Sequence, residues 1–169
     1  MAKSVKPIPD GYHTATPYLR VRGADKAIEF YKKAFGAEEM VRMPGPDGKT
    51  IMHAELKIGD SPIMLGEESK EMNALSPQSV GGTGGGVHLY VRDVDAFVTK
   101  AVAAGAKLAM PVADMFWGDR YGKLTDPFGH EWSVATHKED LTPEQTDERA
   151  KKFFAEFAKQ SKPGKPAKK

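Results

Sequence analysis

The chain of 169 residues contains no cysteine. This excludes disulfide bridges, thiolate nucleophiles and cysteine-bound metal sites, and it is compatible with a reducing compartment. No apolar run approaches the ~20 residues that cross a bilayer, and no signal-like apolar segment lies near the N-terminus. We therefore expect a cytoplasmic protein with no membrane partner.

Charge of one sign is also scarce, because the formal net charge is only +2. Much of the basic excess lies close to the C-terminus, and a basic tail alone is weak evidence for nucleic-acid binding. We expect no nucleic-acid partner. Hydrophobic residues make up 40% of the chain and charged residues 28%, a mixture typical of globular domains.

Two stretches of the chain repeat one pattern of a strand followed by an amphipathic helix. The first passes from Tyr18–Val21 into apolar residues at helical spacing and ends at Gly36. The second passes from His88–Val91 through the capping residue Asp93 into a similar helix that ends at Gly105. Corresponding residues lie about seventy positions apart, which predicts two structural repeats.

Three further strands are predicted in each repeat, so each reads as a βαβββ unit and the fold class as α+β. Turn residues such as Gly59–Asp60 separate the strands. The predicted strands are Glu38–Met43, Thr50–Ile58 and Ser61–Gly66 in the first repeat, and Lys107–Met110, Tyr121–Thr125 and Glu131–Thr136 in the second.

Composition shifts divide the chain into segments. The glycine-rich linker follows no strand and precedes no Lys-Ser/Thr pair, so it does not match a phosphate-binding loop. Thr142 and Gln145 form a capping box before a C-terminal helix whose phenylalanines are expected to pack on the body or on a partner chain. The predicted segments are a flexible leader 1–13, repeat one 14–67, linker 68–85, repeat two 86–137, C-terminal helix 138–160 and disordered basic tail 161–169.

Several motifs resemble the vicinal-oxygen-chelate superfamily, which includes glyoxalase I, extradiol dioxygenases and bleomycin-resistance proteins. These motifs are DPFGH at 126–130 and FYKKAFGAE at 30–38. MHAELKIGDSPIML at 52–65 and FWGDRYGKLTDPFGHEWSVATH at 116–137 are similar to its PhnB-like branch. The resemblance covers roughly 14–137 and says more about fold than about activity, because one scaffold hosts many chemistries.

The resemblance implies that each unit curls into a half-barrel sheet, with its helix on the convex side and a ligand cavity on the concave side. It also implies a homodimer. Strand alternation selects the residues that would line the cavity. They are Thr16, Tyr18, Arg20, His53, Glu55, Met64, His88, Tyr90, Glu131 and Ser133.

Metal-dependent members of the family place one His or Glu on each of up to four strands. The matching positions here are Thr16, Met64, Gly86 and Ser133. None is a good ligand for a divalent metal, which normally needs three or four imidazole or carboxylate ligands. We therefore expect no metal and no other cofactor.

A displaced site is the alternative, because His53, Glu55 and His88 could converge in the cavity. They would form either a shifted zinc, nickel or iron site or a general base held by a carboxylate. Such a site would make the protein a metal-dependent lyase or isomerase, or a dioxygenase, of glyoxalase type. They could equally be cavity-wall polar residues that hydrogen-bond to one another.

Phe116, Trp117, Arg120 and Tyr121 form a second cluster. Aromatic rings with one cation suit a cavity mouth that grips a planar or anionic molecule. Alternatively, Trp117 plugs the end of the barrel and Arg120 pairs with Asp119 or Asp126. The remaining histidines, His13, His130 and His137, are expected to be exposed.

The preferred interpretation is a metal-free protein that binds a small organic molecule in the concave cavity. Whether it is also an enzyme stays open at this point. The residues expected to contact the ligand are Tyr18, Arg20, Met64, Tyr90, Phe116, Trp117, Arg120, Tyr121 and Ser133.

Overall fold

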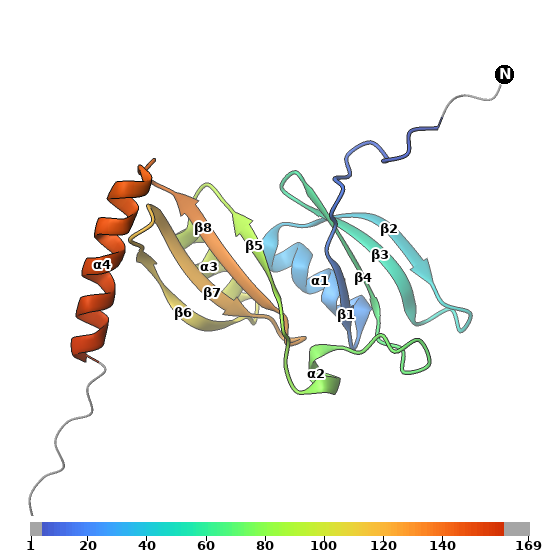
Figure 1. Cartoon of the computed structure of the whole chain (residues 1–169). Coiled ribbons are helices and arrows are strands. Elements are labelled where there is room, and N and C mark those ends of the chain that lie inside the picture. Colours follow the sequence, from blue (N-terminus) through green and yellow to red (C-terminus); the bar gives the residue numbers. More distant parts are fainter. Residues whose placement is uncertain (1–4, 161–169) are drawn as a thin grey trace, which may run out of the picture.

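The computed structural model describes residues 5–160 as two βαβββ modules that stand side by side, followed by a C-terminal helix (Figure 1). The predicted disordered tail 161–169 lies outside the described residues. The first module comprises β1 (Tyr18–Val21), α1 (Ala24–Phe35), β2 (Glu38–Pro44), β3 (Ile51–Ile58) and β4 (Ser61–Glu67). The second comprises β5 (Gly86–Tyr90), α3 (Val94–Ala103), β6 (Lys107–Asp114), β7 (Asp119–Thr125) and β8 (Glu131–His137).

The two sheets share one topology, which confirms the predicted duplication. Their strand orders are β1-β4-β3-β2 and β5-β8-β7-β6, and the first strand of each runs parallel to the last. Both are open, mixed sheets. The linker contains a short helix, α2 (Pro77–Val80), that the sequence did not indicate.

Strict alternation in β3 fails at its first two residues. With His53 and Glu55 on the cavity side, alternation would put Ile51 on that side and Met52 on the apolar side, but Ile51 is buried and Met52 is 47% exposed. The register between β2 and β3 shifts at Met43/Pro44, next to this end of the strand. Such an irregularity moves side chains to the other face, because strand side chains alternate with a period of two.

Helices α1 and α3, one in each module, begin at identifiable caps. Asp93 accepts a hydrogen bond from the Ala96 amide at 3.0 Å, as the sequence predicted. The first helix uses a carboxylate from another element, because Glu67 at the end of β4 accepts from the amides of Gly23 and Ala24 at 2.7 and 2.8 Å. A negative charge at a helix N-terminus is favourable, so this contact fixes α1 against its own sheet.

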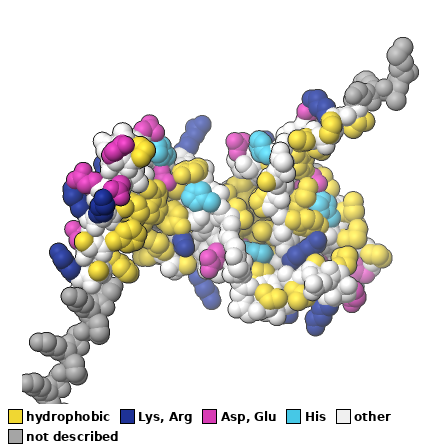
Figure 2. Space-filling model, in the orientation of Figure 1, with side chains coloured by type: hydrophobic (Ala, Val, Ile, Leu, Met, Phe, Trp, Pro, Cys, Tyr) yellow, Lys and Arg dark blue, Asp and Glu magenta, His cyan; other side chains and the backbone are white. Residues whose placement is uncertain are grey.

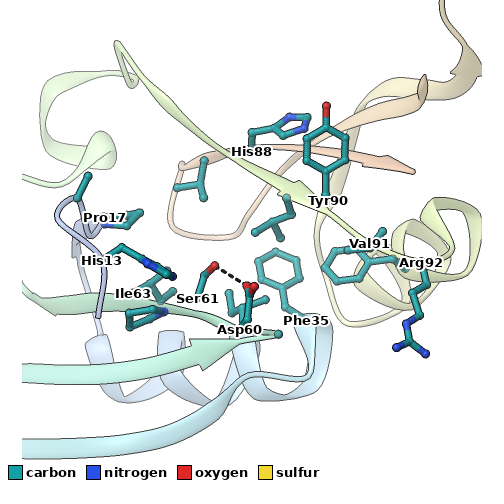
Figure 3. Close-up of a pocket in the computed structure, with 17 residues that line it drawn as sticks. His13, Pro17, Phe35, Asp60, Ser61, Ile63, His88, Tyr90, Val91 and Arg92 are labelled. Atoms are coloured by element: carbon teal, nitrogen blue, oxygen red, sulfur yellow. Dashed lines mark hydrogen bonds between the residues drawn. The ribbon is translucent and has the colours of Figure 1, made fainter. Parts of the chain in front are cut away.

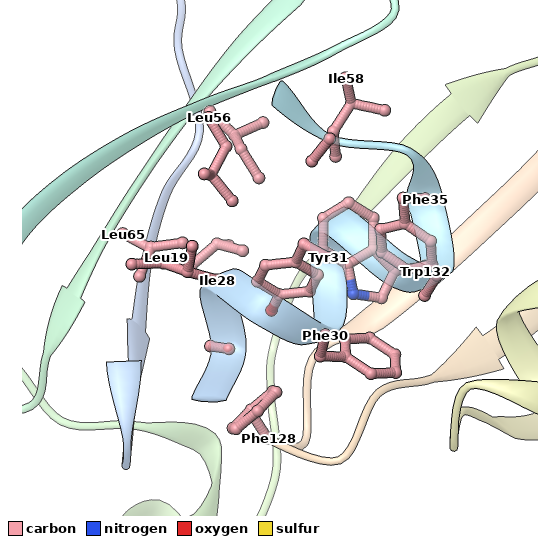
Figure 4. Close-up of a cluster of buried hydrophobic side chains, with 14 of the residues drawn as sticks. Leu19, Ile28, Phe30, Tyr31, Phe35, Leu56, Ile58, Leu65, Phe128 and Trp132 are labelled. Carbon is pink, nitrogen blue, oxygen red and sulfur yellow. The ribbon is translucent and has the colours of Figure 1, made fainter. Parts of the chain in front are cut away.

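The modules share a core that is built around α1 (Figure 4). The rings of Tyr31 and Phe35 lie 5.4 and 4.7 Å from that of Trp132 in β8, measured between centroids. Phe35 also stacks on Phe97 of α3 at 5.3 Å. Large aromatic side chains dominate the energetics of such contacts, so the two modules form one body.

Asp126, the first residue of the DPFGH turn, holds this junction together. It is only 4% exposed, and it accepts from the Tyr31 hydroxyl at 2.7 Å and the Trp132 indole at 2.9 Å. It also accepts from the amides of Phe128 and His130, both at 2.9 Å. The prediction that His130 is exposed is wrong, because the turn half-buries its ring beside the backbone of β1.

Helix α4 (Pro143–Gln160) stands at the far end of the second module (Figure 1). The predicted capping box is confirmed, since Thr142 and Gln145 exchange hydrogen bonds of 2.9 and 3.2 Å. Phe153 packs on Phe116 at 5.3 Å, so part of the phenylalanine stripe lies on the body. Hydrophobic side chains gather there in Figure 2. Among the described residues, no helix is long and apolar enough to span a membrane.

Candidate functional site

Each sheet has one face that no helix of the described chain covers. Tyr18 on the first sheet is 44% exposed and Tyr90 on the second is 65% exposed, although both rings are large. We call these the first and second open faces. The first carries Tyr18, Arg20, His53, Glu55 and Met64, and the second carries His88, Tyr90, Tyr121, Lys123 and Ser133.

A chain of hydrogen bonds crosses the first open face. The Tyr18 hydroxyl lies 3.0 Å from His53 Nδ1, and His53 Nε2 lies 3.1 Å from Glu55 Oε1. Glu55 also accepts from the hydroxyl of Tyr12 in the N-terminal segment. Strand register explains the arrangement, because Met64 of β4 pairs with both Tyr18 and Glu55.

The hydrogen bonds on the first open face shift the pKa values of its groups. The hydrogen bonds from Tyr12 and His53 hold the pKa of the Glu55 carboxyl below its ordinary value. The hydrogen bond to Glu55 raises the pKa of Tyr12 to about 12. Glu55 is therefore an acceptor at neutral pH, which makes His53 Nε2 the donor. In the neutral imidazole, Nδ1 is then free to accept the Tyr18 hydroxyl proton.

Arg20 completes the first open face. Its guanidinium carbon lies 4.1 Å from the centroid of the Tyr18 ring, which is a cation–π contact. Gly66 of β4 provides the space, because a Cβ there would lie 2.5 Å from the Met52 carbonyl oxygen and 3.0 Å from a guanidinium nitrogen of Arg20. A larger residue at position 66 would displace both groups.

The N-terminal segment forms a cavity with the first open face. Its volume is about 530 Å³, within the range of small-molecule sites. The walls combine prolines and an isoleucine of the N-terminal segment with two residues of the sheet. The lining residues are Pro7, Ile8, Pro9, Tyr12, His13, Thr14, Glu55 and Met64.

A larger cavity of about 840 Å³ lies between the modules, beside the edge of β5 (Figure 3). Its apolar side includes Phe35 and Ile63. Asp60 and Ser61 at the β3–β4 turn form its polar side and hydrogen-bond to each other at 2.8 Å. His88 and Tyr90 line it from the second module, which connects it to the second open face.

The second open face is mainly aromatic. His88 Nδ1 lies 2.8 Å from the Ser133 hydroxyl, and the His88 ring contacts Tyr90 and Tyr121 at 4.7 and 6.1 Å between centroids. Lys123 pairs with Ser133 across the strands and so lies on this face. Lys123 was not predicted to lie on this face, although strand alternation from Tyr121 would have placed it there.

The structure places the three residues of the alternative, displaced site on two different sheets. His53 and Glu55 touch, but His88 lies on the other sheet and bonds to Ser133. In the part of the chain that is described, no group of three or more His, Asp or Glu side chains could hold a metal ion. Within one described chain, His53, Glu55 and His88 therefore do not form a metal site, and the displaced site stays untested. The two open faces differ, because one carries acid–base groups and the other aromatic rings.

For the aromatic loop, the predicted partners of Arg120 are wrong. Arg120 pairs with Asp95 at 2.6 Å and Asp114 at 3.1 Å, and not with Asp119 or Asp126. Its charge is therefore engaged within the protein. Phe116 faces α4, with its ring centroid 5.3 Å from that of Phe153.

Asp119 anchors this end of the second module. It is 5% exposed and accepts from the Tyr90 hydroxyl and the Trp117 indole, both at 3.0 Å, and from His137 Nδ1 at 2.8 Å. Burial alone would raise the pKa of its carboxyl, but these three hydrogen bonds hold the pKa below its ordinary value. His137 is exposed as predicted, yet it also contacts Asp140 at 3.0 Å.

The sequence profile of the Glyoxalase/Bleomycin resistance protein/Dioxygenase superfamily matches residues 12–134. The chain belongs to this superfamily. The match begins with the segment that carries Tyr12 and ends within β8, before α4.

Several known proteins are similar to this member of the superfamily. The uncharacterized protein Mb0911c of Mycobacterium bovis is 48% identical over 122 residues, which is 70% of this chain and 80% of the relative. The crystal structure of TioX from Micromonospora sp. ML1 has a TM-score of 0.59 at 27% identity, covering 77% of this chain and all of that one. The Arabidopsis thaliana At5g48480 product has a TM-score of 0.60 at 30% identity, covering 73% and 98%.

The superfamily also includes metal-dependent proteins. FosX of Listeria monocytogenes, crystallised with Mn(II), shares the fold at a TM-score of 0.58 and 18% identity, covering 82% of this chain and 97% of its own. The residues that match the family's metal positions here do not fit such an ion. Thr16 and Ser133 offer hydroxyls, Met64 a thioether and Gly86 no side chain, whereas these metals prefer imidazole and carboxylate ligands.

Proposed function

We propose that this protein is a PhnB-like member of the superfamily that binds a small organic molecule on its open faces without a metal. The observation that carries the proposal is the Tyr18–His53–Glu55–Tyr12 hydrogen-bond chain, which presents fixed polar groups on an uncovered sheet. Ligand sites typically combine apolar walls with a few fixed polar groups, as the adjoining 530 Å³ cavity does.

One structural similarity and one sequence motif support the PhnB-like assignment. The fold is that of a PhnB protein from Bacillus cereus, with a TM-score of 0.56 at 16% identity. The motif at 116–137 resembles the same branch.

We further propose a homodimer in which open faces of two chains meet. Large aromatic rings such as Tyr18 and Tyr90 stay exposed in one chain. A two-fold partner that covers them would bury apolar area and enclose a cavity between unlike faces.

The test is an NMR titration of chelator-treated, ¹⁵N-labelled protein with three aromatic probes, benzamide, benzoate and indole. We expect saturable shift changes at open-face residues such as His53 and Tyr90, with none at α4. The proposal fails if no probe produces saturable shifts on either face, or if shifts require an added divalent cation.

A second candidate function is proton transfer, as in a metal-free isomerase or lyase. It is favoured by the His53 tautomer. Glu55 orients the imidazole ring through Nε2, and Nδ1 contacts the Tyr18 hydroxyl on the open face, so a proton could pass between the ring and a ligand by way of Tyr18. This candidate predicts that wild-type protein, but not His53→Gln, accelerates deuterium incorporation at the methyl group of pyruvate. Equal incorporation by both proteins would reject it.

A further inference from the structure

Arg20 differs from the other arginines of the described residues. Arg22, Arg42, Arg120 and Arg149 each pair with a carboxylate at 2.6 to 3.3 Å. Within residues 5–160, the guanidinium of Arg20 forms neither an ion pair nor a hydrogen bond, although the residue is half-buried. Arg92 also lacks an ion pair, but it is exposed at the edge of the inter-module cavity.

The surroundings of Arg20 orient its donors. The guanidinium carbon lies over the Tyr18 ring at 4.1 Å, and the N–H donors of a guanidinium point outward in its own plane. Gly66 lets the guanidinium lie close to β4, because a Cβ there would lie 3.0 Å from one of its nitrogens. Tyr18 is in turn fixed by its hydrogen bond to His53.

Among the described residues, no carboxylate forms an ion pair with this guanidinium. Glu55 lies on the same open face, but its two oxygens are engaged by Tyr12 and His53. A buried or half-buried guanidinium with no counterion is costly, and a bidentate oxyanion satisfies it best. The first open face therefore lacks one negative group, which a ligand can supply.

We propose that Arg20 binds the oxyanion of the ligand, and that this ligand is a small aromatic or apolar carboxylate or phosphonate. The proposal rests on the proposed function, because it names the ligand class of the same face. The ligand body lies over Tyr18 and extends towards Met64, which pairs with Tyr18 across the strands. Met64 lines the 530 Å³ cavity, so the ligand body reaches that cavity. Its oxyanion accepts hydrogen bonds from the guanidinium in the guanidinium plane.

The experiment compares benzoate with benzamide, which has the same shape without the charge, by NMR titration of wild-type, Arg20→Gln and Arg20→Lys proteins. Benzoate should bind wild type at least about tenfold more tightly than benzamide, because charge-assisted bidentate bonds are the stronger ones. Arg20→Gln should remove this preference, and Arg20→Lys should keep only part of it, since an ammonium group lacks the planar fork.

Arg22→Gln is the matched control, because Arg22 lies two residues away and already pairs with Glu68. It should leave benzoate binding unchanged. Phenylphosphonate and inorganic phosphate form two further arms. Tighter binding of phenylphosphonate than of benzoate assigns a phosphonate-type ligand, and the reverse assigns a carboxylate. Binding of inorganic phosphate as tight as that of either organic anion would overturn the role of the aromatic body.

The outcomes separate this inference from the proposed function. Equal binding of benzoate and benzamide, unaffected by Arg20→Gln, overturns the oxyanion site and leaves small-molecule binding standing. A loss of benzoate binding in Arg22→Gln equal to that in Arg20→Gln also overturns it, because the effect would then be one of general charge. No saturable binding of any probe overturns both.

Discussion

At the scale of single residues, several carboxylates in this protein each accept hydrogen bonds from two or more donors. Asp126 accepts from four donors at the module junction and Asp119 from three at the other end of the second module. Each carboxylate therefore ties together elements that are distant in sequence. Glu55 does the same on the first open face, where it joins the N-terminal segment to β3.

The junction is expected to be sensitive to Asp126. Asp126→Asn replaces one acceptor oxygen by an NH₂ group that faces donors, so we expect the free energy of unfolding to fall by about 2 to 3 kcal/mol. Tyr31→Phe removes one donor and should cost about 1 kcal/mol. Urea denaturation measures both, with exposed Asp60→Asn as the control. A loss for Asp126→Asn no larger than the control would contradict the assigned role.

Tyr12 offers a pH measurement on the first open face. Its hydrogen bond to Glu55, together with burial, raises its pKa to about 12. In an NMR titration of the tyrosine ring carbons, the resonance missing from Tyr12→Phe should titrate near that value. Glu55→Gln should move it back towards about 10, the ordinary tyrosine value. An unshifted Tyr12 in the wild type would show that the N-terminal segment does not rest on the sheet.

At the scale of helices and strands, periodicity and turn chemistry predicted most of the fold. The repeated strand–helix pattern, the Asp93 cap and the Thr142/Gln145 capping box are local signals, and the structure contains all three. The missed features depend on tertiary contacts. Glu67 caps a helix that begins more than forty residues earlier in the chain.

The candidate site was predictable only where its contacts lie within one strand. Alternation along β3 placed His53 and Glu55 together, since they belong to one strand face. It did not reveal the Tyr12 contact, which spans 43 positions. It also gave no means of knowing that the two sheets would keep His88 apart from His53, because module packing depends on α1 and the buried Asp126.

The segment after β8 should respond to pH through His137. Hydrogen bonds to Asp119 and Asp140 raise its pKa above the ordinary value. A raised folded pKa gives stability that is complete below the unfolded value of about 6.5 and is lost as the pH rises through the folded value. The lowered pKa of Asp119 has the opposite sign, so its contribution is lost as the pH falls through its folded value.

We therefore expect the free energy of unfolding to decline as the pH rises above about 6.5. His137→Gln should flatten this slope, while the same change at exposed His13 should leave it intact. Urea denaturation at several pH values measures the effect. A wild-type slope identical to that of His137→Gln would mean that the His137 contacts contribute nothing.

At the scale of the whole molecule, one chain presents two unlike open faces and joins its modules through a shared aromatic core. The first face offers acid–base groups and an arginine, and the second offers aromatic rings with Lys123. Figure 1 shows both sheets with their uncovered faces and α4 away from the module junction. The arrangement is suited to enclosing a ligand between unlike faces when two chains associate.

The proposed homodimer predicts a sedimenting species of twice the chain mass at micromolar concentration. Tyr18→Asp combined with Tyr90→Asp places charge on both open faces and should shift the protein to monomer, while its circular dichroism is unchanged. Exposed Met72→Asp on the linker is the control. A wild-type monomer throughout the concentration range would contradict the proposal.

The central claim is that an organic ligand binds the open faces without a metal, and calorimetry tests it most directly. Chelator-treated protein is titrated with the tightest-binding aromatic probe, with and without added manganese or zinc. We predict saturable heat of the same affinity in both cases, and none when the metal alone is added. Heat that appears only with the metal present, or stoichiometric binding of the metal itself, would contradict the claim.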